Sequence, residues 1–93
     1  MLFANKIKQL REERGLLQRQ LASVLEIDTP MYSKIERGDR RAKREQVGII
    51  AKLLQTDEKE LLTLWLADQV VAVVADEKDI ADKILTIAKE RIK

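Results

Sequence analysis

Residues 16–38 read LLQRQLASVLEIDTPMYSKIERG, and this stretch contains two short runs of apolar residues with helical spacing. Within Gln18–Leu25 and again within Thr29–Arg37, the apolar side chains recur three and four positions apart. Asp28 and Thr29 are both good N-cap candidates for the second run. Pro30 suits a first helical turn, where its missing N–H would have had no partner. The spacing therefore predicts two helices that are joined by a short turn.

Two short helices at this separation are typical of a helix-turn-helix motif. The small residue Ala22 lies where the helices would cross, and Leu25 and Ile27 flank the turn. Tyr32 and Ile35 are expected to face inward from the second helix. An α-helix fits the major groove of duplex DNA, where the start of the second helix can present side chains to base edges. The motif therefore predicts a helix that reads DNA.

The rest of the chain is also predicted to be helical. It contains only three glycines and one proline, all before residue 50, and no segment alternates long enough to indicate a strand. Further helices are expected from Ala4 or Asn5 to Arg14, from Glu45 to Gln55, from Glu58 to Ala75, and from Asp76 onward. Gly15 is expected to supply the left-handed residue that ends the first helix. The fold class is therefore all-α.

The C-terminal third is unusually apolar. The segment Glu58–Ala75 is apolar on more than one face, so we expect it to be buried on two sides. Two interpretations stay open: a helical hairpin that completes the core of one chain, and a dimerisation element. The second divides the chain into a helix-turn-helix domain, residues 1–66, and a helical extension, residues 67–93. The candidate dimerisation residues are Trp65, Val70, Val74, Ile80, Ile84 and Ile87, of which Trp65 is expected either in the core or at the interface.

Composition limits the chemistry of this chain. Its 93 residues include 18 basic and 16 acidic residues, no cysteine and no histidine, and this length predicts one domain. The missing residue types exclude disulfides, thiolate nucleophiles and the commonest metal ligands. Carboxylate and lysine chemistry stay open, but no pattern places a nucleophile beside a base or three ligands around a metal, so we expect no enzyme, no metal and no cofactor. The longest apolar run, Val70–Ala75, is six residues, whereas a membrane span needs about 20, so we expect a cytoplasmic protein without a membrane partner.

Charge is distributed unevenly along the chain. The first 55 residues carry twelve basic and seven acidic residues, a net charge of +5, and the remaining residues carry six and nine, a net charge of −3. Within Lys34–Arg44 there are six basic residues and two acidic ones. This excess predicts a phosphate-binding loop that follows the second helix of the helix-turn-helix motif. Contacts to phosphates supply affinity for DNA but no sequence information. The alternative is a charged loop that is only solvated.

Four blocks of this sequence occur in the order and spacing of a known family. They are IKQLREERGL (7–16), Gln18–Ala22, YSKIERG (32–38) and VGIIAKLLQTDEKELL (47–62). Over about residues 4–63 the chain thus resembles the phage-repressor and Cro-like family, the XRE family of helix-turn-helix regulators. The resemblance implies a five-helix lambda-repressor-like bundle, here with a C-terminal helical extension. It also implies a homodimer on operator DNA, with two half-sites about one helical turn apart.

The resemblance implies roles for single residues as well. The candidate base readers are Thr29, Met31, Ser33 and Lys34, of which Thr29 could contact a phosphate instead. The candidate phosphate-binding residues are Gln18, Arg37, Arg40, Arg41, Lys43 and Arg44. Arg11 and Glu36 match a pair that forms an internal salt bridge in this family. Gln18 and Thr29 have an alternative interpretation as ordinary helix-end residues.

Three positions depart from the family pattern. Leu17 stands where Ser or Thr commonly caps the second helix, so we expect that helix end to lack its side-chain acceptor. Glu26 occupies a turn position commonly taken by glycine, which predicts a mildly strained left-handed backbone. Pro30 replaces a polar side chain that reads a base in many relatives. The operator sequence therefore cannot be inferred by analogy.

The leading hypothesis is a dimeric, sequence-specific transcriptional regulator, either a repressor or a small autoregulatory controller. Its reading helix would be about Thr29–Arg37. The alternatives are a protein-interaction adaptor and an antitoxin-like partner protein, both of which would use the C-terminal helices.

Overall fold

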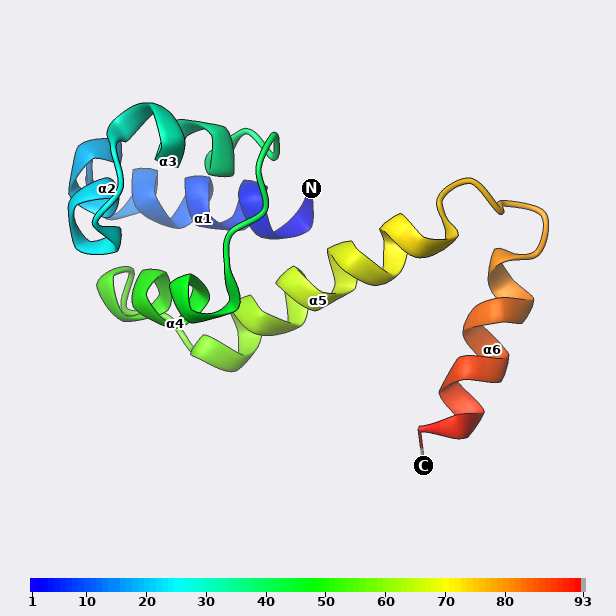
Figure 1. The fold of residues 1–93 in the computed structure, drawn as a ribbon. Helices are drawn as coiled ribbons and strands as arrows, with labels where there is room; N and C mark the ends of the chain where they lie inside the picture. Colours follow the sequence, from blue (N-terminus) through cyan, green and yellow to red (C-terminus); the bar gives the residue numbers. More distant parts are fainter. Residues whose placement is uncertain (93) are drawn as a thin grey trace.

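The computed structural model describes residues 1–92, which form six helices and no strand. The helices are α1 (Leu2–Glu13), α2 (Gln18–Leu25), α3 (Thr29–Glu36), α4 (Arg44–Leu53), α5 (Glu58–Val74) and α6 (Ala81–Arg91). Helices α1 to α4 and the first half of α5 form a bundle (Figure 1). The second half of α5 extends away from this bundle, and α6 lies apart from it (Figure 1). The all-α prediction is confirmed.

One hydrophobic core lies inside the bundle. Its members come from α1 to α4, from the loop before α4 and from the first half of α5, and they follow the predicted spacing of three and four. They are Phe3, Ile7, Leu10, Leu21, Ala22, Leu25, Tyr32, Ile35, Ala42, Val47, Ile50, Ala51, Leu54 and Leu61. Leu61 is the one fully buried residue of α5. Five helices thus close a single core.

The turn between α2 and α3 has the expected conformation. Glu26 is left-handed, with φ of 56°, which costs about 1 kcal/mol for a residue with a side chain. Asp28 caps α3, because its carboxylate accepts a hydrogen bond from the Met31 N–H at 2.7 Å. Leu17 offers no side-chain acceptor to the start of α2. Instead its own N–H donates to the Gln20 side chain at 2.7 Å.

The start of α1 differs from the prediction. The helix begins at Leu2, before the expected Ala4 or Asn5, because α5 supplies its cap. The two carboxylate oxygens of Asp68 accept hydrogen bonds from the N–H groups of Leu2 and Phe3, at 2.9 and 3.0 Å. These donors would otherwise lack an intrahelical partner. The cap stands 66 residues away in the sequence, so no local pattern indicated it.

Two other helix boundaries were predicted wrongly. Helix α4 ends at Leu53, and Gln55, which was expected to be helical, is left-handed with φ of 53°. Helix α6 begins at Ala81 and not at Asp76, because residues 75–80 form turns. Two backbone bonds stabilise these turns, from Glu77 to the Val74 carbonyl and from Ile80 to the Glu77 carbonyl.

The expected burial of the C-terminal third is wrong for the single chain. Beyond Trp65 no side chain of α5 is fully buried, and Val73 is 77% exposed. Helix α6 buries no residue at all, so the hairpin that would complete the core does not form. Of thirteen exposed large apolar side chains within residues 1–92, eight lie from Leu66 onward. No helix in this part of the chain is long and apolar enough to cross a membrane.

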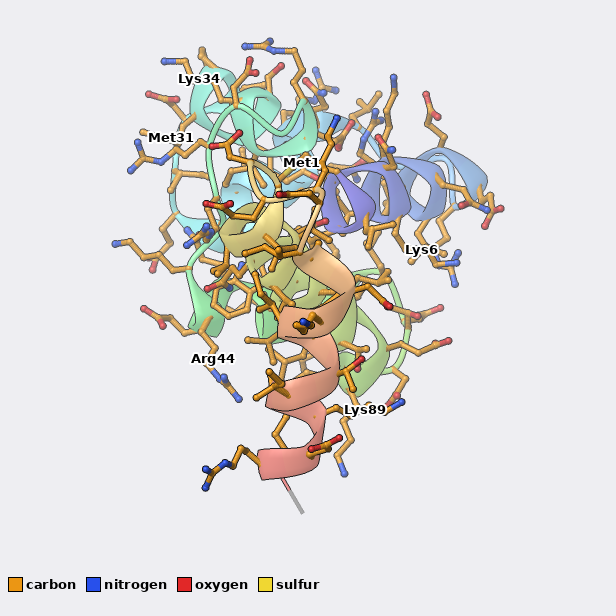
Figure 2. The ribbon with its side chains drawn as sticks, turned by 90° about the vertical axis from the view of Figure 1, so that its right-hand side faces the viewer. Met1, Lys6, Met31, Lys34, Arg44 and Lys89 are labelled. Carbon is orange, nitrogen blue, oxygen red and sulfur yellow. The ribbon has the colours of Figure 1, made fainter. Side chains whose placement is uncertain are left out.

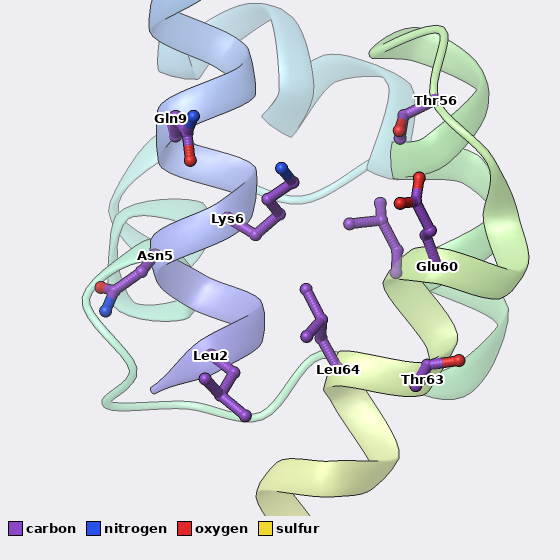
Figure 3. Close-up of a pocket in the computed structure, with 9 residues that line it drawn as sticks. Leu2, Asn5, Lys6, Gln9, Thr56, Glu60, Thr63 and Leu64 are labelled. Atoms are coloured by element: carbon purple, nitrogen blue, oxygen red, sulfur yellow. The ribbon is translucent and has the colours of Figure 1, made fainter.

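A groove of 540 Å³ lies between α1 and the first half of α5 (Figure 3). Leu2 and Leu64 form its apolar part, while Lys6 and Glu60 project from opposite walls (Figure 3). A second hollow of 440 Å³ shares Leu2 and extends to Val71. The apolar surface of α5 is therefore continuous with apolar surface on α1.

Candidate nucleic-acid interface

Helix α3 has an inner face that is buried in the bundle and an outer face that is exposed to solvent. Tyr32, Ile35 and Glu36 are buried, whereas Lys34 and Thr29 are exposed. Met31 and Ser33 are half-buried at the edges of the outer face. Figure 2 shows Lys34 and Met31 on the same side of the molecule. The outer face of α3 is therefore available to a ligand.

A nearly buried ion pair anchors the end of α3 to α1. The Arg11 guanidinium donates two hydrogen bonds to the Glu36 carboxylate, each of 2.9 Å, and a third to the Leu16 carbonyl. The side chains of Arg11 and Glu36 are only 12% and 2% exposed. The structure thus forms the predicted salt bridge, and the parallel two-bond geometry sets the position of α3 against α1.

The environment of Glu36 shifts its ionisation. Burial alone would raise the pKa of the carboxyl, but the hydrogen bonds from Arg11 and Gln18, together with the nearby Tyr32 hydroxyl, outweigh burial and hold the pKa below its usual value. Burial and the same carboxylate raise the pKa of the Tyr32 phenol. The Tyr32 hydroxyl is fully buried and makes no hydrogen bond of good geometry within residues 1–92. Glu36 is therefore ionised and Tyr32 neutral at pH 7.

Gln18 lies at the start of α2, close to this network. Its amide nitrogen donates a hydrogen bond of 3.3 Å to the Glu36 carboxylate. The amide group carries a second hydrogen, which remains available to another acceptor. The Glu36 network therefore orients the Gln18 side chain.

A polar hollow of 410 Å³ lies on one side of α3. It is lined by Gln18 and Arg37, and also by Asn5 and Lys8 of α1, which were not among the predicted site residues. A local signal for them exists in the sequence. Asn5, Lys8 and Arg11 follow one another at steps of three, so they share a face of α1. Because Arg11 was expected to reach Glu36, that face had to lie beside the end of α3.

A basic hollow also lies beside α3. Met31 lines it together with Arg40, Arg41 and Lys43, and its volume is 230 Å³. These three basic side chains are exposed and form no ion pair with any residue of 1–92. Arg44 is also exposed, but it lies well apart from Met31 (Figure 2).

Arg37 is held by two exposed contacts. Its guanidinium forms an ion pair with Asp39 at 3.1 Å and donates a hydrogen bond of 3.0 Å to the Ser33 hydroxyl. An exposed pair of this kind stabilises a protein by about 1 kcal/mol or less, so a phosphate can replace it at low cost. Arg37 is therefore a candidate phosphate-binding residue at the end of α3.

Trp65 lies against the core, one of the two places expected for it. It was a candidate dimerisation residue, but its ring packs against the core and its indole N–H donates a hydrogen bond of 2.8 Å to the Ala42 carbonyl. Contacts within one chain therefore account for Trp65. The other candidates do lie on the protruding part of the chain, where Val70, Ile80 and Ile87 are exposed and Val74 and Ile84 half-buried.

A family model described as helix-turn-helix matches residues 7–61, which is more than half of the chain. The chain belongs to this helix-turn-helix family, the XRE/Cro type. No curated protein and no solved structure matches it. Membership confirms the predicted family, gives this helix-turn-helix protein a lambda-repressor-like fold and makes DNA its partner. It supports DNA binding by a transcriptional regulator and not the activity of an enzyme.

Proposed function

We propose that this helix-turn-helix protein is a sequence-specific transcriptional regulator, a repressor or small autoregulatory controller, that binds its operator as a homodimer. The observation that carries the proposal is the exposed face of α3 that bears Lys34, next to a hollow that Met31 of the same helix lines together with Arg40, Arg41 and Lys43. Lys34 would read a base edge, with Ser33, Thr29 and Met31 as further base contacts. Gln18, Arg37, Arg40, Arg41, Lys43 and Arg44 would bind phosphates, together with Lys8.

The total surface of the chain supports a second copy as partner. A monomeric protein of 10.7 kDa should expose about 5,500 Å², whereas this chain exposes 6756 Å². Its radius of gyration is 15.0 Å, against about 12 Å for a compact domain of this length. If a dimer interface buried the excess exposed surface of each chain, it would bury about 2,500 Å² in total. This area is within the usual range for permanent homodimers.

The arrangement of apolar residues on α5 supports more than one covering helix. At about 100° per residue, the exposed apolar side chains from Val73 through Val70 to Val71 span an arc of about 160°. One packed helix covers an arc of about 100°. Helix α6 and its N-cap residue carry a similar arc, which runs from Ile87 through Ile80 and Ile84 to Leu85. In a dimer, α5 and α6 of one chain could pack with α5 and α6 of the other as a four-helix bundle. This packing would bury the apolar side chains of all four helices.

Two alanine variants test the DNA-binding roles. The operator is first selected from a pool of random duplexes with the wild-type protein. Lys34→Ala should then weaken operator binding by about tenfold and relax the base preference at one position, because a base contact is lost. Arg41→Ala should weaken binding to all sequences alike and reduce the slope of log K against log salt by about 0.9.

Equal behaviour of Lys34→Ala and Arg41→Ala would contradict the assignment of roles. If the wild type does not bind duplex DNA at low salt, or binds without dependence on salt, the DNA-binding proposal fails. The protein-interaction adaptor would then be the better description.

A further inference from the structure

Two side chains of α5 contact the bundle next to the basic loop. Trp65 and Asp68 stand three residues apart and therefore on the same side of the helix. Trp65 donates its hydrogen bond to the Ala42 carbonyl, and Asp68 accepts the N–H groups at the start of α1. Ala42 is buried, but its neighbours Arg41 and Lys43 are exposed. The contact from Trp65 thus lies between two candidate phosphate-binding residues.

The loop between α3 and α4 is tied down at both ends by other bonds. Asp39 and Arg40 donate their backbone N–H groups to the Lys34 carbonyl, and the Lys43 N–H donates to the Gln46 side chain. Between these anchors, the bond from Trp65 is the only hydrogen bond within residues 1–92 that reaches Arg41 or Ala42. The bond from Trp65 therefore holds the middle of the loop, together with the packing of the Ala42 side chain in the core.

Asp68 leaves Arg41 available. The two residues line the same pair of hollows, but they form no ion pair in the described part of the chain. Each Asp68 oxygen instead accepts one hydrogen bond from α1. The guanidinium of Arg41 is exposed and can meet an anion.

We propose that Trp65 is a positioning residue for DNA phosphate binding: its hydrogen bond to Ala42 holds Arg41 and Lys43 in the arrangement that meets the backbone of duplex DNA. This inference rests on the proposed DNA-binding function. Without the bond, the loop samples other conformations, and the apparent affinity falls with the fraction of molecules in the binding arrangement. The effect concerns phosphates alone, so it is independent of DNA sequence.

Trp65→Phe tests this proposal, because phenylalanine retains an aromatic ring and removes the N–H donor. Binding to a random-sequence duplex should weaken by about three- to tenfold, as expected from the loss of one hydrogen bond. The slope of log K against log salt should fall by about 0.9 to 1.8, corresponding to one or two phosphates. Binding is measured well below the unfolding transition, with circular dichroism as the check of folding.

Asp57→Ala is the matched control. It removes the N-cap bond of α5, from the Glu60 N–H to Asp57 at 3.2 Å, without touching the loop. Its duplex affinity and salt slope should equal those of the wild type, although its stability is lower. Unchanged affinity and slope in Trp65→Phe would overturn the proposal, as would an equal loss in Asp57→Ala.

The fluorescence of wild-type protein gives a second readout, because Trp65 is the only tryptophan of the chain. Its emission should change on saturation with random duplex, and the change should be absent when Arg41 and Lys43 are both replaced by alanine. No change at saturation would overturn the inference while leaving DNA binding intact. Failure of the wild type to bind duplex would instead overturn the proposed function, and this inference with it.

Discussion

The Arg11–Glu36 pair is the residue-scale feature on which the reading helix depends. A buried ion pair adds little net stability compared with apolar residues, because both charges lose their hydration. Loss of one partner is costly, however, since the other remains buried and charged. The pair sits directly below Gln18 and at the end of α3. The pair therefore contributes mainly by placing Gln18 and α3, which carry proposed DNA contacts.

Glu36→Gln should lower the free energy of unfolding by about 3 kcal/mol at pH 7, because Arg11 keeps a buried charge without a counter-ion. The folded-state pKa of Glu36 lies below its unfolded value of about 4.3. The stabilisation is therefore present above pH 4.3 and is lost as the pH falls through the folded-state pKa. Urea unfolding should be measured from pH 7 to pH 2. The difference in free energy of unfolding between wild type and variant should become smaller in acid. A constant gap would contradict the role of ionised Glu36.

Among the helices, α1 is the one whose boundary depends on a distant element. Its first turn has no local side-chain cap, and Asp68 of α5 provides the acceptors instead. A carboxylate at this end also interacts favourably with the helix dipole. The expected domain boundary between residues 66 and 67 therefore falls inside α5. It would separate Asp68 from the bundle, although Asp68 caps α1 of that bundle.

Asp68→Ala should destabilise the protein by about 1–2 kcal/mol, because two N–H groups lose a charged acceptor. Amide hydrogen exchange should accelerate in the first turn of α1. Asp79→Ala is a suitable control, since this exposed carboxylate lies in the turns before α6, and its effect should stay within about 0.5 kcal/mol. Equal stability of the two variants would show that the Asp68 bonds are not needed.

At the scale of the whole molecule, the chain divides into a closed bundle and an extended apolar arm (Figure 1). Within residues 1–92 the bundle contains every buried residue, and eight of the thirteen exposed large apolar side chains lie on the arm, residues 66–92. Such an arm is a poor monomer surface and a good dimer surface. Dimerisation would also place two reading helices on one operator.

Ile84→Asp should convert the proposed dimer into a monomer, because it places a charge in the apolar arc of α6. Sedimentation equilibrium should give a mass near 10.7 kDa for this variant and about twice that for the wild type. Lys83→Asp, on the polar side of the same helix, should stay dimeric. Truncation after Val74, which keeps Asp68, should be monomeric with a folded bundle. A monomeric wild type, or a dimeric Ile84→Asp, would contradict the proposed interface.

The sequence alone determined the helices, the helix-turn-helix motif and the inward-facing residues of the bundle. These features depend on neighbours three or four positions apart, on Asp28 and Pro30 at a helix start, and on Glu26 in a turn. All of these interactions are local, so periodicity and residue type are sufficient to indicate them. The Arg11–Glu36 pair joins residues that are far apart in the sequence. It could be predicted only because the two positions match a salt bridge of the family.

Only the tertiary structure decided where α5 meets the rest of the molecule. The bonds of Asp68 to α1 and of Trp65 to Ala42 join residues 66, 65 and 23 positions apart. Packing also brought Lys8 beside Gln18 and left the second half of α5 uncovered. An apolar face looks the same in the sequence whether its own chain or a partner covers it. That choice depends on how the helices pack, because the hydrophobic effect has no direction of its own.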